Sequence, residues 1–408
     1  MPLREDANQI IKAALSAAMP DAAVHAALEN ANFPDGRLVL IATGKAGWQM
    51  AKAAYDLLGE RINHGVVVTK YGHSRGEIGN LEIYEAGHPV PDGNSFLGTQ
   101  MALNAVADLK KNDTVLFLLS GGGSALFEKP LIPEIDLSRV TGELLACGAD
   151  ITEINTVRKR FSAVKGGRFA LACHPAQVFT IVLSDVLGDR LDVIASGPAY
   201  PDSSTAAEAC EIARKYNLTL TPQMEQLLHA ETPKKLDNVT TCVTGSVRQL
   251  CTAAEQKCRE LGYETVMLTD CLSCEARDAG VLLSDLAAQH AGGGKKAFIA
   301  GGETVVRVTG NGLGGRNQEL ALAAAPGISG LNAAVFSVGS DGTDGPTDAA
   351  GGYVDTETAA KLNTQGIRVS DVLADNDAYH ALQKCGGLIF TGPTGTNVND
   401  ISVLLIGE

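Results

Sequence analysis

The chain alternates short apolar runs with longer segments of helical spacing, and this alternation limits the folds that it can adopt. Residues 38–42 are continuously apolar, and so are residues 115–119 of the predicted strand 114–119, as in strands buried on both faces of a sheet. Residues 95–110, 247–261 and 274–290 carry apolar residues at helical spacing. The pattern predicts an α/β fold with mainly parallel sheets covered by helices. The other predicted strands are residues 66–69, 81–86, 177–183, 239–243, 265–268, 297–300, 305–309, 333–338 and 402–406.

A polar segment near the middle of the chain predicts two domains. The chain has 408 residues, more than one domain usually holds. Residues 232–238 (TPKKLDN) include Pro233, follow a predicted helix and precede a strand. We therefore expect an N-terminal Rossmann-like α/β domain over residues 1–235 and a C-terminal α/β domain over residues 236–408. The glycine-rich segment 291–296 is an alternative join.

Charge and cysteine content exclude several classes of partner. The formal net charge of −14 argues against nucleic acid or an anionic membrane as the main partner. The nine cysteines show no pattern of secreted disulfides. The first 19 residues resemble an amphipathic helix rather than a signal peptide, and no run approaches transmembrane length. We expect a cytoplasmic protein, and the sequence leaves a homo-oligomer open.

One basic island stands out in this acidic chain. Residues 154–184 contain no Asp or Glu but include Arg158, Lys159, Arg160, Lys165 and Arg168. The island fits either a site for a small anion or a helix face paired with acids elsewhere.

Lys45 lies between a predicted strand and a predicted helix, directly after Gly44. It is either an ordinary solvated lysine or an anion-binding cation supported by free N–H groups at the helix start. The stretch is not a Walker A loop, because Val39 stands where the first glycine should be and Ala46 follows the lysine.

Two further loops carry candidate ligand contacts. After residues 114–119 the sequence reads SGGGSALFEKP, so that Ser120 and Ser124 flank Gly121, Gly122 and Gly123. Bare N–H groups and hydroxyls there favour phosphate or carboxylate binding over a simple tight turn. His88, in the stretch GHPVPDGNS, is a candidate substrate contact within an otherwise structural turn.

Two acidic loops are candidates for a divalent ion. Asp185 and Asp189 follow residues 177–183, where they would hold a metal or accept a proton; a helix N-cap at Ser184 or Asp185 is the alternative. Asp341 and Asp344 lie among glycines after residues 333–338, which suits magnesium carried by a nucleotide. The spacing of an EF-hand calcium loop is absent.

The loop VTGNGLGGRNQE has two interpretations. Gly310, Gly312 and Gly315 match G-x-G-x-x-G, a dinucleotide fingerprint. The loop comes late in the chain, and no acid ends a strand about twenty residues further on, as the fingerprint requires. The alternative is a phosphate loop in which Arg316 clamps a transferring phosphoryl group.

The ordered series of motifs resembles the glycerate 2-kinase family, also called the MOFRL family. The matching stretches are ATGKAG, GHPVPDGNS, LLSGGGSALFEKP, NTVRKRFSAVKGGR, LSDVLGDRLDVIASGP, GGETVVRVTGNGLGGRNQE, GSDGTDGPTDAAGG and TGPTGTNVND, spread from about residue 40 to 400. The resemblance implies ATP- and Mg²⁺-dependent phosphorylation of D-glycerate on its 2-hydroxyl, with the active site in the cleft between two α/β domains. The family was often labelled hydroxypyruvate reductase, so an NAD(P)H-dependent reductase is the alternative function.

The resemblance also assigns roles to residues. It matches Lys45 and Arg316 to the family's essential basic pair and makes Asp189 a catalytic or metal-linked acid. Asp185, Asp341 and Asp344 are the candidate metal ligands. The expected contacts to glycerate or ATP are Gly44, His88, Ser120, Gly121, Gly122, Gly123, Ser124, Arg158, Lys165, Ser184, Gly312, Gly314, Gly315, Asn317 and Gln318.

Overall fold

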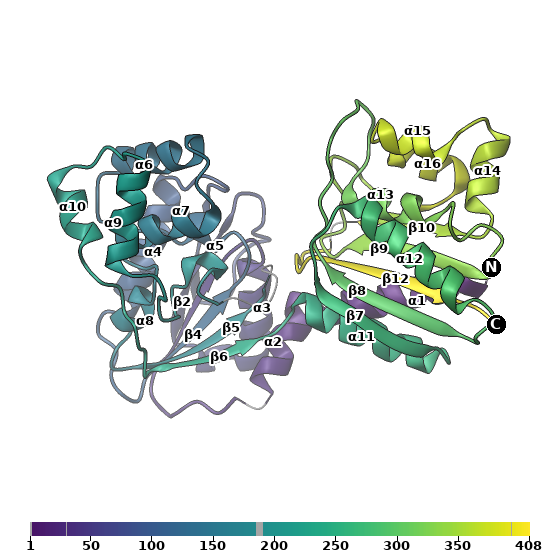
Figure 1. Ribbon diagram of the computed structural model, residues 1–408. Helices are drawn as coiled ribbons and strands as arrows, with labels where there is room; N and C mark the ends of the chain where they lie inside the picture. Colours follow the sequence, from purple (N-terminus) through teal and green to yellow (C-terminus); the bar gives the residue numbers. More distant parts are fainter. Residues whose placement is uncertain (1, 30, 185–190, 393) are drawn as a thin grey trace. The chain divides into compact units, whose positions relative to one another are not determined.

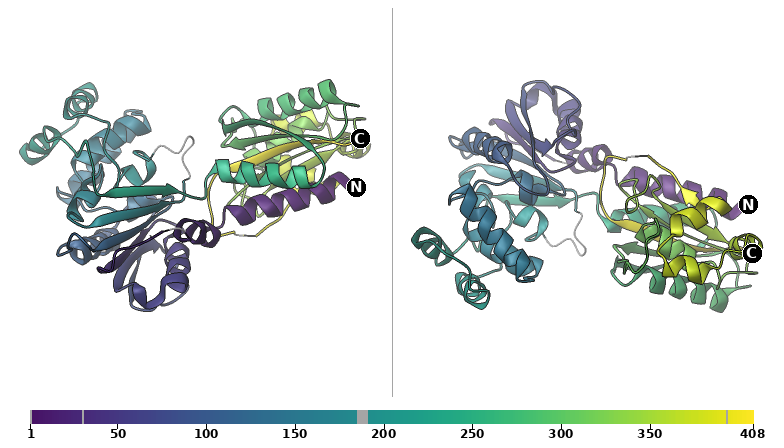
Figure 2. Two further views of the ribbon diagram at one scale, coloured as in Figure 1. Left: turned by 90° about the horizontal axis from the view of Figure 1, so that it is seen from below. Right: turned by 90° about the horizontal axis from the view of Figure 1, so that it is seen from above.

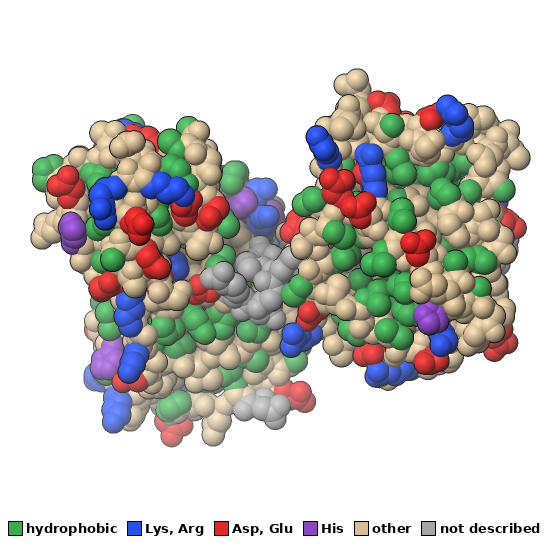
Figure 3. All heavy atoms as spheres, viewed as in Figure 1, with side chains coloured by type: hydrophobic (Ala, Val, Ile, Leu, Met, Phe, Trp, Pro, Cys, Tyr) green, Lys and Arg blue, Asp and Glu red, His purple; other side chains and the backbone are tan. Residues whose placement is uncertain are grey.

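The computed structural model describes residues 2–29, 31–184, 191–392 and 394–408 (Figure 1). The chain forms two compact units. One comprises Ala23–Thr244 and is called the parallel-sheet unit. The other combines Met1–Ala22 with Gly245–Glu408 and is called the mixed-sheet unit. In the space-filling view, acidic and basic side chains both occur on the visible face of each unit (Figure 3).

The parallel-sheet unit has six strands in the order β3-β2-β1-β4-β5-β6, all parallel. The strands are β1 (Leu38–Thr43), β2 (His64–Lys70), β3 (Leu81–Ala86), β4 (Thr114–Leu119), β5 (Gln177–Val182) and β6 (Val239–Val243). β1 and β4 are buried along their whole length, as their apolar runs predict. This strand order is that of the Rossmann fold, in which ligands bind where the order reverses, between β1 and β4.

One helix precedes these strands, and further helices and helical turns connect them. They are α2 (Pro20–Leu28), α3 (Gly47–Leu58), η1 (Gly59–Arg61), α4 (Gly93–Val106), α5 (Gly123–Leu126), α6 (Glu134–Ala146), α7 (Ile151–Arg160), α8 (Arg168–Ala172), η2 (Ile194–Ser196), α9 (Ala206–Lys215) and α10 (Pro222–Leu228). α3 and α4 pack against β1 and β2. α6, α7, α9 and α10 share a separate apolar cluster around Val157 and Phe161. That cluster fixes α7, which carries part of the basic island.

The mixed-sheet unit corrects the prediction that both sheets are mainly parallel. Its strand order is β11-β10-β9-β12-β8-β7, and only β7 and β8 pair in parallel. The strands are β7 (Glu264–Leu272), β8 (Lys296–Gly302), β9 (Ala333–Gly339), β10 (Gly351–Asp355), β11 (Leu388–Ile389) and β12 (Asp400–Ile406). The C-terminal strand β12 inserts between β8 and β9 and runs opposite to both. An apolar run does not encode its strand direction.

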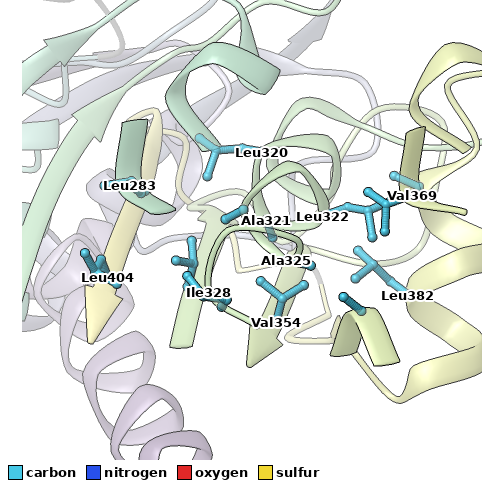
Figure 4. Close-up of a cluster of buried hydrophobic side chains, with 14 of the residues drawn as sticks. Leu283, Leu320, Ala321, Leu322, Ala325, Ile328, Val354, Val369, Leu382 and Leu404 are labelled. Atoms are coloured by element: carbon cyan, nitrogen blue, oxygen red, sulfur yellow. The ribbon is translucent and has the colours of Figure 1, made fainter. Parts of the chain in front are cut away.

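Helices cover both faces of the mixed sheet (Figure 2). They are α1 (Pro2–Ala17), α11 (Val247–Glu260), α12 (Ala276–His290), α13 (Arg316–Ala324), α14 (Thr358–Thr364), α15 (Val369–Ala374) and α16 (Ala378–Cys385). α1 and α11 lie on one face, and α12 and α13 on the other (Figure 2). α13 is buried on nearly every side, and its residues Leu320, Ala321 and Leu322 lie in one apolar cluster with Val354 and Leu382 (Figure 4).

The N-terminal helix α1 packs in the mixed-sheet unit. The Tyr263 hydroxyl donates to Asp6 (2.6 Å), and the Thr396 hydroxyl donates to the Ala18 carbonyl (2.8 Å). The predicted domain boundary at residue 235 lies before Gly245, where the mixed-sheet unit resumes. That prediction also assigned α1 to the domain of the parallel sheet, whereas α1 belongs to the mixed-sheet unit. An amphipathic helix gives no local sign of which sheet it will cover.

The remaining differences are in short segments. Residues 305–309 are not a strand, since only Val305 bridges, to Glu275. β10 was missed because it begins with two glycines, which disfavour strands, and β11 because it has only two residues. Across the described ranges, no helix combines the length and apolarity that crossing a bilayer requires.

Candidate active site

The loops after β1 and β4 form one structure at the point where the strand order reverses. The Ser120 amide donates to the Thr43 carbonyl (3.0 Å), and the Lys45 amide donates to the Gly121 carbonyl (2.8 Å). The Ser120 hydroxyl accepts from the Ala46 amide (3.1 Å). A Cβ on Gly44 would lie 2.2 Å from that hydroxyl oxygen, so this contact requires glycine. The structure therefore brings together Gly44, Lys45 and Ser120, which the sequence predicted as site residues without predicting their contact.

The loop after β4 leaves a run of backbone donors open. The N–H groups of Gly121, Gly122, Gly123 and Ser124 donate to none of the described residues. Gly122 has φ +85°, a conformation that glycine adopts without strain. Successive amides in such a loop form a concave site that attracts anions.

The Lys45 side chain lies beside this loop. A Cβ on Gly122 would be 3.2 Å from Lys45 Cγ and 3.0 Å from His88 Cδ2, which places the three residues together. Within the described part of the chain, the Lys45 ammonium has no hydrogen bond or ion pair. Partial burial, together with the charges of Lys45 and Lys70, lowers the pKa of His88, which favours a neutral imidazole.

Next to them lies a pocket of about 220 Å³, called the His88 pocket. Its polar lining comes from His88, Ser124, Asn155 and Arg158. The other lining residues are Pro89, Gly122, Ala125, Ile151, Val193, Ile194 and Ala195. Asn155 and Arg158 project from one face of α7, three residues apart. The structure thus gathers His88, Gly122, Ser124 and Arg158, and it adds Asn155, whose spacing to Arg158 was readable within NTVRKR.

The rest of the basic island is used inside the chain. The fully buried Lys165 ammonium donates to the carbonyls of Ser124 (2.8 Å) and Phe127 (3.1 Å) and pairs with Glu128 (3.3 Å). Burial lowers the pKa of Lys165 to about 8, although Glu128 opposes the shift. Lys165 therefore lies beneath the loop and not in the pocket lining, although the sequence had predicted a contact to glycerate or ATP.

Lys159, Arg160 and Arg168 are likewise internal. Lys159 pairs with buried Asp202 (2.9 Å). Arg160 donates to Thr232 Oγ1 (3.0 Å), and Arg168 donates to the Ser162 carbonyl (2.6 Å). Of the island's cations, only Arg158 lines the pocket. Pairing with acids elsewhere in the chain holds for Lys159, Arg160 and Lys165, whereas Arg168 donates to backbone carbonyls.

Arg316 opens α13 in the mixed-sheet unit. Its Nε and Nη2 atoms donate to the two oxygens of Asp400, the Nη2 contact at 3.0 Å. Nη1 lies 3.1 Å from Glu303. Burial alone would lower the pKa of Arg316. Asp400 and Glu303 raise the pKa by more than burial lowers it, so the guanidinium stays charged. Three of the five N–H groups that a guanidinium carries meet these acids, which leaves two for a ligand.

Similarity to known proteins identifies the family. Residues 6–229 match the family described as "Domain of unknown function (DUF4147)", and residues 296–400 match the "MOFRL family". The chain belongs to the DUF4147/MOFRL family. This confirms the resemblance inferred from the motifs.

Relatives of the DUF4147/MOFRL chain are similar over its full length. A D-glycerate 2-kinase of Thermotoga maritima is 51% identical, covering 99% of this chain and 98% of the relative. A glycerate 2-kinase of Pyrococcus horikoshii is 40% identical, covering 100% and 98%. A crystal structure of a Thermotoga maritima glycerate kinase has a TM-score of 0.95 at 50% identity and covers 99% of both chains. A putative hydroxypyruvate reductase of Agrobacterium vitis is 39% identical, covering 91% and 100%.

In this member of the DUF4147/MOFRL family, Asp344 caps α13. Its carboxylate accepts from the amides of Asn317 (3.2 Å) and Gln318 (2.9 Å). Burial raises the pKa of Asp344 to about 6, against the lowering effect of these hydrogen bonds. A Cβ on Gly315 would lie 2.2 Å from Asp344 Cγ, so glycine admits the capping carboxylate.

The predicted metal ligands are not brought together by the described residues. Asp341 accepts from the Thr343 amide (2.9 Å) in a local turn, while Asp344 is occupied by α13. Asp185 and the predicted catalytic acid Asp189 lie outside the described residues, and Ser184 before them is buried. Over the described part of the chain, no three His, Cys, Asp or Glu side chains are grouped as a metal site requires.

The glycine-rich loop before α13 faces the chain itself. Gly310 and Leu313 donate their amides to the side chains of Asn376 (3.0 Å) and Asp377 (3.0 Å). The Gly312 amide donates to the Asp375 carbonyl (2.8 Å). The amides of Gly310, Gly312 and Leu313 are therefore already used within the chain and are not presented to a phosphate.

The other contacts predicted around Arg316 are also structural. Gly312 and Gly314 pack closely against residues 375–378. Asn317 is buried between Asp344 and Ser337. The side-chain amide of Gln318 donates through Nε2 to Thr347 Oγ1 (2.9 Å). These residues shape the platform that holds Arg316, and the acids Asp400 and Glu303 on that platform were missed. Asp400 ends the quoted stretch TGPTGTNVND.

Proposed function

We propose that this chain is a glycerate 2-kinase, which transfers the γ-phosphoryl group of ATP to the 2-hydroxyl of D-glycerate. The products are 2-phosphoglycerate and ADP. Full-length similarity to two glycerate 2-kinases supports the activity. The observation that supports this use of the site is the Lys45 ammonium, which lies beside four amides at the reversal of strand order and, like them, has no partner among the described residues.

Phosphoryl transfer demands positioning and charge neutralisation more than covalent chemistry. The Lys45 ammonium and the amides of Gly121–Ser124 supply positive charge and hydrogen-bond donors suited to phosphate oxygens. Arg316 supplies two further N–H groups on a guanidinium already oriented by Asp400. We therefore assign Lys45 and Arg316 to the neutralisation of charge on the transferring group.

The His88 pocket suits the acceptor acid. Its volume of about 220 Å³ fits a three-carbon acid but not a nucleotide. The Arg158 guanidinium is the cation that would bind the carboxylate. Its Nη2 atom donates to the Ser124 carbonyl and pairs with Glu128. The neutral imidazole of His88 can accept a hydrogen bond from the reacting hydroxyl.

Kinases use Mg²⁺ to bridge phosphates and neutralise their charge, and the ion is usually held by the nucleotide with one or two carboxylates. Asp344 does not fit that role, because both of its oxygens accept backbone amides of α13, whereas Asp341 uses one oxygen in the turn with Thr343. We keep Asp189 as a proposed metal-linked acid on the strength of the family resemblance, and Asp185 because it lies just after the predicted strand at residues 177–183.

The glycine-rich loop counts against the reductase alternative at three positions, because the amides of Gly310, Gly312 and Leu313 already donate to residues 375–377. After β1 the turn carries Lys45 in place of a glycine fingerprint.

The test is a pair of assays on the purified chain. We expect ATP- and Mg²⁺-dependent conversion of D-glycerate, with the product identified as the 2-phosphate by phosphorus NMR. With hydroxypyruvate we expect no oxidation of NADH or NADPH above background. NADH oxidation without ATP consumption would overturn the proposal, and a 3-phosphate product would overturn the position of transfer.

A further inference from the structure

Three consecutive residues at the edge of the His88 pocket have left-handed backbone. Ala195, Ser196 and Gly197 have φ of 50°, 60° and 64°. Such a conformation is sterically costly for residues other than glycine and persists only where the surroundings enforce it. Strained backbone of this kind clusters at functional sites. Ser196 is therefore a candidate for a functional role.

Ser196 is fixed by hydrogen bonds to three segments. Its side chain is fully buried, its hydroxyl donates to Asn155 Oδ1 on α7 (3.1 Å), and its carbonyl accepts from the Gly166 amide (3.0 Å). The Ser124 hydroxyl lies 3.2 Å from the Ser196 hydroxyl. Since a serine has one hydroxyl proton, Ser124 donates to Ser196, and Ser196 donates to Asn155.

The relay ends at the Asn155 side-chain amide, which offers its oxygen to the Ser196 hydroxyl. The carbonyl oxygen of the amide is the acceptor, so its NH₂ group remains as a donor. That group donates to none of the described residues, although Asn155 is only 7% exposed and lines the pocket. Asn155 and Arg158 therefore offer a neutral and a charged donor from the same face of α7.

We propose that Asn155 binds the carboxylate of the hydroxy acid together with Arg158, and that Ser196 is a positioning residue that fixes the orientation of the Asn155 amide. This inference rests on the proposed function, because it takes the acceptor acid as the occupant of the pocket. Without the Ser196 hydroxyl, the amide can turn its oxygen toward the pocket and repel the carboxylate.

Ser196→Gly is the decisive variant, because glycine relieves the left-handed strain while it removes the hydroxyl. We expect unchanged or higher thermal stability and a KM for D-glycerate raised about tenfold, as for the loss of one hydrogen bond to a charged group. The KM for ATP should stay within twofold, roughly the scatter of such measurements. Ser203→Ala, an exposed serine on the same connection, is the matched control.

A double-mutant cycle separates positioning from general packing. Asn155→Ala should raise the KM for D-glycerate at least as much as Ser196→Gly, and the double variant should be no worse than Asn155→Ala alone. Additive effects, or a Ser196→Gly variant with normal KM for D-glycerate, would overturn the inference. A wild type without ATP-dependent turnover of glycerate would instead overturn the proposed function.

Discussion

Replacement of Arg316 by methionine should expose how much the Arg316–Asp400 pair contributes to the mixed-sheet unit. The Asp400 side chain is only 7% exposed and accepts two N–H groups from the guanidinium. Burial raises the pKa of Asp400, while Arg316 opposes that shift. Without Arg316, the carboxylate loses its only cationic partner within the described residues.

The magnitude follows from burial. Removal of one partner of a fully buried ion pair destabilises a protein by about 3–5 kcal/mol. The Arg316 side chain is 32% exposed, so water partly compensates. We expect a loss of roughly 2–3 kcal/mol in the free energy of unfolding. Asp400→Asn in the methionine background removes the unpaired charge and should recover about 2 kcal/mol of it.

The assay is urea denaturation of the wild type, both single variants and the double variant, combined with kinetics on Arg316→Lys. Lysine can still approach Asp400 but cannot hold two acids and keep two N–H groups for phosphate. We expect its kcat to fall at least tenfold (an order-of-magnitude figure) while KM for ATP changes much less. Single effects that add within about 0.5 kcal/mol would refute the pairing argument. A lysine variant that loses only ATP affinity would refute a role in the transition state.

Three further outcomes are expected. Lys45→Ala should lower kcat by orders of magnitude without lowering the melting temperature, whereas Lys52→Ala, an exposed lysine on α3, should leave both unchanged; normal turnover would make Lys45 an ordinary lysine. Treatment with EDTA should abolish kinase activity and added Mg²⁺ should restore it, and full activity after chelation would contradict this. Asp344 has a pKa of about 6, so from about pH 4 to 6 the folded chain keeps a proton that the unfolded chain loses, and its stability contribution falls as pH rises. Asp344→Asn should remove this dependence of the free energy of unfolding on pH, measured by urea denaturation at several pH values, with Asp341→Asn as the control. An unchanged pH dependence would contradict the raised pKa of Asp344.

The parallel-sheet unit could be predicted well because its signals are local. The apolar runs of β1 and β4 are continuous, and the turn with Lys45 and the loop with Ser120 follow them directly. In a parallel sheet the carboxyl ends of strands lie at one edge, so two loops distant in sequence had to come close. The mixed sheet lacked such signals, because the pairing of β12 with β8 and β9 is decided by contacts far along the chain.

The fate of individual charges could not be read from the sequence. Arg158 and Lys159 are neighbours on α7, yet one lines the pocket and the other meets buried Asp202. Helical geometry separates them by about 100°, and the acid that captures Lys159 comes from a distant segment. Lys165 was likewise expected to contact a ligand. The sequence around it gave no sign of its actual partners, because Glu128 and the carbonyls that accept from its ammonium belong to another loop.

The two glycine-rich loops show what a glycine pattern does establish. Glycine marks a place where something approaches the backbone closely, but the approaching group can be a ligand or the chain itself. At Gly312 it is the chain, since a Cβ there would lie 2.4 Å from Asp377 Cβ and the amide already has an acceptor. At Gly121–Gly123 the amides have no acceptor among the described residues. Buried or partly buried N–H groups rarely remain unpaired in a folded protein, so the amides beside Lys45 need an acceptor beyond the described residues, whereas the amides of residues 310–313 already have acceptors within the chain.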